Sequence, residues 1–159
     1  MQKCISIIFI LLLAFQANQA LADPGAEITQ NIQFGRYVIR NDNAGAALQV
    51  AYDGNVISDN AFIPVNSTAK NGIIKMSGFT PGESLLLTIT FLPDPLTLTC
   101  SCSSPDFQIS NFQVETTSVT ADISGEAFIR FGARLVAQGG AYGDVSYSGA
   151  LTVRIIVNS

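Results

Sequence analysis

The amino-acid sequence predicts an all-β protein, an antiparallel β-sandwich that follows an N-terminal export signal. Three observations predict this fold. Apolar and polar residues alternate with a period of two in several segments, as they do in strands with one buried face. Turn-forming clusters of Gly, Pro, Asn and Asp separate these segments. After the export signal, no window of twelve residues carries a clear apolar stripe at the helical spacing of about 3.6 residues.

The start of the chain has the three parts of a secretory signal peptide. Lys3 gives a short positive segment, residues 4–15 form an apolar run, and a small-x-small cleavage site ends at Ala22. The apolar run is shorter than the about 20 residues that span a bilayer. We therefore expect cleavage between Ala22 and Asp23, and export of residues 23–159 as one domain to the periplasm, the cell surface or the extracellular space. A buried N-terminal helix or an uncleaved anchor is the alternative. No second long apolar run follows, so we expect no transmembrane span in the exported chain.

The N-terminal half of the exported chain is predicted to form five strands. The clearest is at residues 85–91, where large apolar side chains from Leu85 to Phe91 occupy every second position. Ser58–Phe62 is a candidate for a short helical turn. Shorter alternating runs predict the other four strands, at residues 28–34, 48–52, 74–76 and 96–98.

The C-terminal half is predicted to form three strands. Residues 129–135 and 151–157 each place apolar side chains at odd positions and more polar ones between them. In Phe107–Val114 the apolar positions change from odd to even partway along the segment. A β-bulge near Ser110-Asn111 would redirect the side chains in this way.

Composition and charge exclude several classes of protein. The 159 residues include no His and no Trp, so a Ser-His-Asp triad, a Cys-His pair and an imidazole metal site are excluded. The formal net charge of −4, without a basic block, argues against a nucleic-acid partner. Carboxylates are scattered singly and form no recognisable catalytic pattern. We therefore predict no enzyme and no cofactor; a hydrolase that uses paired carboxylates is the alternative.

Two local features are candidate sites. Cys100 and Cys102 are the cysteines of the exported chain, and export favours their oxidation. They are a candidate disulfide; two buried thiols or a thiolate metal or redox site are the alternatives. The oxygen-rich stretches Asp53–Asn55 and Asp59–Asn60 do not match the spacing of a calcium-binding loop. We interpret them as solvated turns and predict no metal site.

Both ends of the exported chain are predicted to be strands rather than tails. The first runs through residues 27–34 and the last through residues 149–158. Sheet edges recruit further strands, so two such ends suggest self-association or contact with other surface subunits by strand addition. We favour the simpler interpretation, in which both ends pair inside one complete sandwich.

Short motifs spread over residues 30–157 resemble a family of bacterial exported β-sandwich proteins classed as a domain of unknown function. This family is similar in pattern to spore-coat-U-like proteins and chaperone–usher pilin subunits. The resemblance implies an Ig-like or pilin-like sandwich and a structural role at the cell surface rather than catalysis. The motifs are Phe34-Gly35, the run from Gly72 through Gly78 to Gly82, Phe131-Gly132-Ala-Arg-Leu135, Gly140-Ala-Tyr142-Gly143, and Tyr147-Ser-Gly149 before the last strand.

The residues of these motifs have simple physical roles. Gly78 and Gly82 flank a Pro turn, Gly132 permits close approach of two strands, and Gly149 releases the chain into its last strand. Tyr142 and Tyr147 are expected to cap one end of the core with their hydroxyls in water.

We therefore expect an exported, non-catalytic structural or adhesive protein, such as a subunit of an appendage or coat. The alternative is a secreted or periplasmic binding module for a glycan or small ligand. Aromatic side chains converging at one loop end, such as Tyr142 and Tyr147, would favour that alternative.

Overall fold

The computed structural model describes residues 24–40, 44–66, 68–142 and 146–158. The predicted signal segment, with its cleavage between Ala22 and Asp23, lies outside the described residues. Within them the chain forms twelve strands and no helix, and no helix there could cross a membrane. The strands are β1 Gly25–Gln30, β2 Arg36–Ile39, β3 Ala47–Val50, β4 Val56–Ser58, β5 Phe62–Asn66, β6 Gly72–Ser77, β7 Ser84–Leu92, β8 Leu96–Leu98, β9 Phe107–Val114, β10 Ser118–Thr120, β11 Ala127–Ala137 and β12 Thr152–Asn158.

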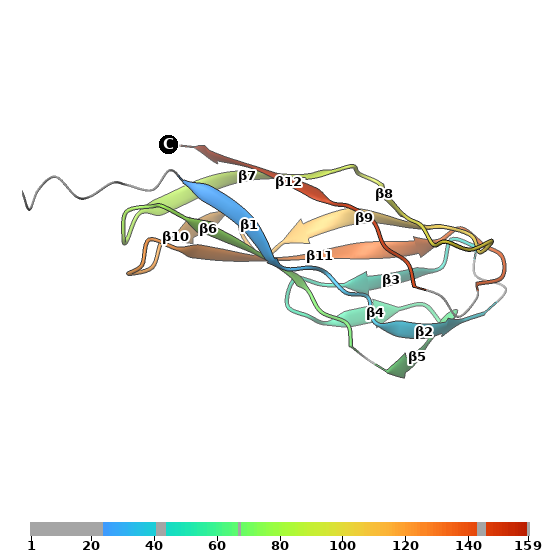
Figure 1. The fold of residues 1–159 in the computed structure, drawn as a ribbon. Helices are drawn as coiled ribbons and strands as arrows, with labels where there is room; N and C mark the ends of the chain where they lie inside the picture. The colour runs from blue at the N-terminus through green and yellow to red at the C-terminus, as the bar shows by residue number, and fades with distance from the viewer. Residues whose placement is uncertain (1–23, 41–43, 67, 143–145, 159) are drawn as a thin grey trace, which may run out of the picture.

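The largest sheet is organised around β11, its longest strand (Figure 1). The first half of β11 pairs with β6 and its second half pairs with β3. Its other edge pairs with β9. The sheet continues outward from β6 to β1, from β3 to β4 and from β9 to β8, and every pair is antiparallel.

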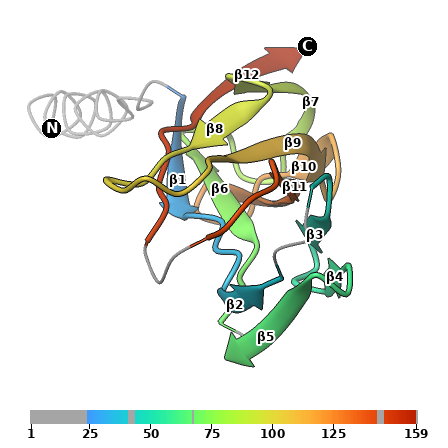
Figure 2. The ribbon, with the colours of Figure 1, turned by 90° about the vertical axis from the view of Figure 1, so that its right-hand side faces the viewer.

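Two smaller sheets cover different parts of the large one. β10, β7 and β12 form a three-stranded sheet that packs over the half containing β6 and the start of β11. β2 and β5 form a two-stranded ribbon near β3 and β4 (Figure 2). The antiparallel, all-β prediction is therefore confirmed.

The core consists of two clusters of buried side chains, one under each of the smaller sheets. One cluster lies between the three-stranded sheet and the large sheet. The other lies between the β2–β5 ribbon and the other half of the large sheet. Ile32, Phe112 and Leu151 are only partly buried and pack against both clusters, so they mark where the two meet.

The long alternating segments form the strands that their patterns predict. Leu85, Leu87 and Phe91 are buried on β7, and every odd position of β11 from Ile129 to Leu135 is buried. β12 is also present, but its Val157 is 43% exposed because it lies at the end of the sheet. The change of parity in β9 occurs at a bulge, as predicted: the register with β11 shifts between Ser110 and Gln113, and Asn111 has a φ of 52°.

Short elements differ from the prediction. The sequence pattern does not predict β2, β4, β5 or β10, whose lengths are between three and five residues. The stretch Ser58–Phe62, a candidate helical turn, instead ends β4 and turns into β5. The turn is closed by the Phe62 N–H, which donates to the Asp59 carbonyl at 3.0 Å. This single bond makes a β-turn between strands rather than a helix.

Candidate functional site

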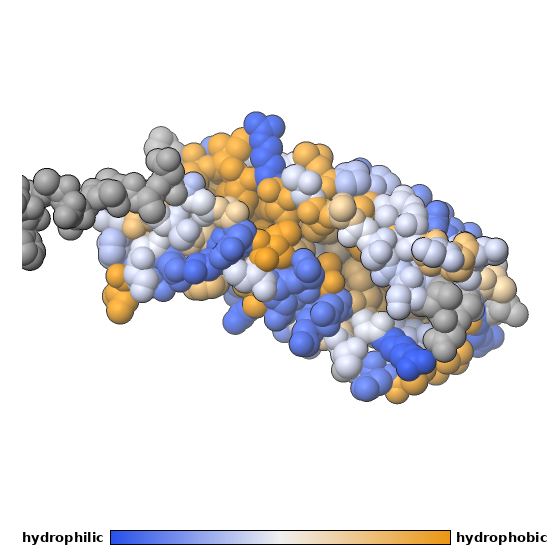
Figure 3. All heavy atoms as spheres, in the orientation of Figure 1, coloured by the Kyte–Doolittle hydropathy of each residue, from blue (hydrophilic) through white to orange (hydrophobic). Residues whose placement is uncertain are grey.

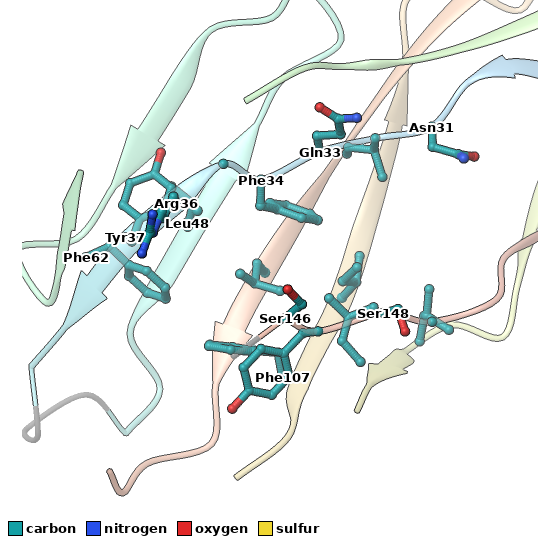
Figure 4. A pocket seen from close by; sticks show the side chains of 18 of the residues that line it. Asn31, Gln33, Phe34, Arg36, Tyr37, Leu48, Phe62, Phe107, Ser146 and Ser148 are labelled. Atoms are coloured by element: carbon teal, nitrogen blue, oxygen red, sulfur yellow. The ribbon is translucent and has the colours of Figure 1, made fainter. Parts of the chain in front are cut away.

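A long apolar groove opens on one face of the molecule, over the point where the two core clusters meet. One wall is the connection from β1 to β2, residues 31–35, and the other is the segment of residues 146–151 that leads into β12. In Figure 4, Phe34 projects from the first wall, while Ser146 and Ser148 lie on the second. The groove has a volume of about 1310 Å³, larger than the roughly 300–1,000 Å³ of a typical small-molecule site.

Each wall is held by a bridge to a residue outside the groove. Gln33 and Lys70 exchange two backbone hydrogen bonds, both of 2.8 Å. Ser148 and Thr99 do the same at 3.0 and 3.1 Å. Among the described residues, β1 pairs only with β6 and β12 pairs only with β7, so each strand has one unpaired edge. The groove therefore lies between two walls that do not pair with each other.

The floor of the groove is apolar and nearly free of charge. It is formed by β9 and β11, with further side chains from β3, β5 and β8. Of the residues that the structure describes, Arg36 is the only one with a charged side chain in the lining of the groove, and it already has an interaction partner in the protein. No carboxylate and no cysteine belongs to the lining given by the described residues. The apolar floor side chains are Phe107, Ile109, Phe112, Phe131, Leu135, Leu48, Phe62, Leu96 and Leu98.

Comparison with protein families gives a match over residues 26–157 to the family described as a domain of unknown function, DUF4402. The chain belongs to this family. The comparisons with curated proteins and with solved structures found no significant match. The groove and both of its walls fall inside the matched residues, so they are part of the DUF4402 domain.

Eight of the motif residues of this DUF4402 domain line the groove: Phe34, Gly35, Phe131, Leu135, Tyr142, Tyr147, Ser148 and Gly149. A side chain at Gly149 would place its Cβ 2.7 Å from Leu98 Cδ2, so this wall lies against β8 as closely as the backbone allows. Four motif glycines lie elsewhere. Gly78 and Gly82 flank the β6–β7 turn, Gly132 lies within β11, and Gly140 follows β11.

One end of the groove in the DUF4402 domain is aromatic. The Phe107 ring stacks on Tyr142 at a centroid distance of 4.4 Å and meets Tyr147 edge-on at 4.7 Å. The Tyr142 hydroxyl accepts a hydrogen bond from the Gln138 N–H at 2.9 Å and donates to the Asp106 carbonyl at 3.2 Å. Burial raises the pKa of Tyr142, which keeps this hydroxyl protonated and able to donate. Tyr142 therefore ties the end of β11 to the start of β9.

The expectation that both hydroxyls lie in water is wrong for Tyr147, whose hydroxyl is buried, while the hydrogen bonds of the Tyr142 hydroxyl lie at an exposed position. The Tyr142 hydroxyl is bonded to the backbone, and the Tyr147 hydroxyl is buried. Within the part of the chain that is described, the Tyr147 hydroxyl has no hydrogen-bond partner. A buried hydroxyl without a partner loses its bonds to water and gains nothing in return.

This difference predicts opposite effects of the same substitution. We expect Tyr142→Phe to lower the free energy of unfolding by about 0.5–1.5 kcal/mol, because the Gln138 N–H loses its acceptor at an exposed position where water can replace it. We expect Tyr147→Phe to leave it unchanged or raise it by about 1 kcal/mol, because a hydroxyl without a partner is removed. Urea titrations of the two variants measure this contrast. Equal losses in both would mean that the Tyr147 hydroxyl is also bonded.

Cys100 and Cys102 are joined in a disulfide in the segment between β8 and β9. Neither residue lines the groove, so the disulfide shapes a loop of the DUF4402 domain rather than the site. Among the described residues, no group of three or more Cys, Asp or Glu side chains is placed to hold a metal ion. The Asp53 carboxylate instead accepts a hydrogen bond from the Asn55 N–H at 3.0 Å within its own turn.

Both terminal strands pair within the chain, as the favoured interpretation expects: β1 pairs with β6 and β12 pairs with β7. A groove lies between the segments attached to them. Sequence reasoning identified both terminal strands. It did not locate the groove, whose floor comes from β9 and β11, far from both ends along the chain.

Proposed function

We propose that this protein is an exported, non-catalytic structural subunit that completes its β-sandwich by accepting a strand from another polypeptide. The observation that carries the proposal is the apolar groove between the walls attached to β1 and β12. It combines an unfilled part of the core with unpaired strand edges next to it. An added strand gains main-chain hydrogen bonds at such an edge and buries side chains in the gap.

The energetic reason to accept a strand is the apolar area that the groove leaves exposed. Ile32, Phe112 and Leu151 belong to the core by position but are only partly buried. Covering apolar surface stabilises a protein by about 25 cal/mol per Å². Figure 3 shows apolar side chains gathered on this face between β1 and β12, next to a hollow. Open strand edges beside apolar surface are otherwise a liability for aggregation.

The chemistry of the lining supports a structural role. Among the described residues it contains no carboxylate, histidine or cysteine, so the hydroxyls of Ser146 and Ser148 on its wall have no carboxylate or imidazole beside them in the lining to act as a general base. The signal-like start of the chain and the Cys100–Cys102 disulfide support an oxidising compartment outside the cytoplasm. The motif resemblance to pilin-type and spore-coat-U-like proteins supports a place in a surface assembly.

A small-ligand or glycan site is the second candidate function. The observation in its favour is the aromatic end of the groove, formed by Phe107, Tyr142 and Tyr147. However, these rings pack on one another at 4.4 to 6.1 Å between centroids, so their faces are largely used within the protein. Sugar rings need open aromatic faces, and the strand-accepting role therefore has the stronger support.

The proposal is tested by blocking the groove in the host that produces the protein. Ser146→Trp places a large ring on a groove wall, and Ser118→Trp places the same ring on β10, outside the groove. We expect the exported wild-type protein and Ser118→Trp to elute in assemblies larger than one chain. Ser146→Trp is expected to elute as a monomer with unchanged circular dichroism.

Hydrogen exchange gives an independent measurement of the same event. Main-chain amides of residues 31–35 and 146–151 are expected to exchange more slowly in the assembly than in the isolated chain. The proposal is wrong if all exported protein is monomeric, or if Ser146→Trp assembles as the wild type does. N-terminal sequencing of the same material tests export, for which a chain that begins at Asp23 is expected.

A further inference from the structure

The lining of the groove restricts which kinds of partner can bind there and which side chains such a partner can place in it. This step rests on the proposed function, since it concerns the strand that the groove accepts. Three properties of the site bear on the partner: the two walls, the charge of the lining and the gap between the core clusters.

The walls favour an extended polypeptide over a lipid chain or a compact ligand. Both are main-chain segments continuous with strands that have an unpaired edge among the described residues. β1 and β12 run in opposite directions. In Figure 1 the chain runs from left to right along β1 and from right to left along β12, toward the marked C-terminus. A strand between them is antiparallel to one wall and parallel to the other, and both pairings satisfy its N–H and C=O groups.

The lining disfavours charge on the side of the partner that faces inward. Arg36 is the only charged side chain among the described residues that line the groove, and it already has a partner. An incoming carboxylate or ammonium would therefore lose its hydration without gaining a free counter-charge. Burial of an unpaired charge in apolar surroundings is the most costly change that such a site can impose.

The gap between the core clusters gives the position of the main anchor. Ile32 on the first wall, Leu151 on the second and Phe112 on the floor all touch both clusters and all line the groove. A side chain placed among them contacts both clusters at once. Phe112 also stacks on the buried Phe91 at a centroid distance of 4.6 Å, so this part of the floor is rigidly supported.

From these three properties we propose that the partner is an extended segment of another polypeptide with an uncharged inward face. It inserts a large aliphatic side chain among Ile32, Phe112 and Leu151. The side chains on either side of this anchor, two residues away, lie over the floor made by Phe107 in one direction and Phe131 in the other. The intervening side chains point to solvent and are free to be polar.

Three synthetic peptides test the proposal on the purified exported protein. The first alternates isoleucine and valine with threonine over nine residues and carries lysine at both ends for solubility. The second is identical except for aspartate at the central inward position. The third has the composition of the first with its alternation scrambled. Binding is measured by anisotropy of labelled peptides, and its place by hydrogen exchange at residues 31–35 and 146–151.

We expect the alternating peptide to bind and to protect both walls. The aspartate peptide is expected to bind at least about tenfold more weakly, and the scrambled peptide not to bind. Ile32→Ala is expected to weaken the alternating peptide by about tenfold, while Thr29→Ala, at an exposed position of β1, leaves its affinity unchanged.

The possible failures separate the two levels of the proposal. If the aspartate peptide binds as tightly as the alternating one, the uncharged anchor is wrong while strand acceptance stands. If a fatty acid displaces the alternating peptide and the scrambled peptide binds equally well, the groove selects apolar chains rather than strands, and this inference is overturned. If no peptide binds and the exported protein is monomeric, the proposed function itself fails.

Discussion

Replacing Phe131 by alanine is expected to lower the free energy of unfolding by about 3–5 kcal/mol. The ring is 1% exposed, lies 5.2 Å from the Phe91 ring between centroids, and also forms part of the groove floor. It lies directly over Gly72 of the neighbouring strand, where a Cβ atom would collide with it. Alanine would remove this contact and leave a cavity that a sheet cannot close, because its hydrogen bonds hold the strands apart.

Phe128→Ala on the same strand is the matched control for this experiment. Phe128 is three residues away, points to the opposite face of β11 and is 50% exposed. We expect it to change the free energy of unfolding by less than about 1 kcal/mol. Chemical denaturation of both variants measures the difference. Losses of similar size would show that the two faces of β11 are not buried as the fold requires.

Replacing Gly132 by alanine is expected to cost at least about 3 kcal/mol, an unusually large effect for the addition of one methyl group. A Cβ atom at this position would collide with the Val50 carbonyl oxygen and would lie 2.6 Å from the Ala51 carbonyl carbon and 2.7 Å from the Tyr52 nitrogen. All three atoms belong to backbone, so no side chain can rotate away. The contact arises because the end of β3 folds closely over β11 at this point.

Gly54→Ala separates this contact from a general effect of removing glycine. Gly54 has a φ of +87°, and no atom lies within 4 Å of the position that a Cβ would take there, so alanine suffers only an unfavourable backbone conformation. That costs about 1 kcal/mol. Thermal or urea unfolding of both variants should therefore rank Gly132→Ala well below Gly54→Ala in stability. The reverse ranking would mean that β3 does not approach β11 so closely.

The strands that could be predicted from the sequence are those whose burial depends on local alternation. β7 and β11 are long, and their apolar side chains repeat every second residue, so their buried faces follow from the pattern alone. The bulge at Asn111 is equally local, because it leaves a change of parity in the sequence. β4 has two adjacent apolar residues and β10 has a single one, so neither shows the alternation that Leu96 and Leu98 give to the equally short β8.

The candidate site was only partly accessible to sequence reasoning. Motif residues such as Phe34, Tyr142 and Gly149 line the groove. Ile32 and Phe112, which join the two core clusters there, carry no signal that distinguishes them from other core residues. The orphan hydroxyl of Tyr147 is also invisible in sequence, because its partners depend on packing.

By itself, the sequence determined that the protein is built from antiparallel strands, where the long strands lie, and that a strand lies near each end of residues 24–158. These properties depend on neighbours along the chain. Only the tertiary structure decided which strands pair. It attached β1 to β6 and β12 to β7, so that the segments next to the two terminal strands border a groove. Strand order is set by contacts between residues far apart in the chain. The alternation of apolar and polar residues is the same whichever strand lies alongside, so it does not predict the pairing partner.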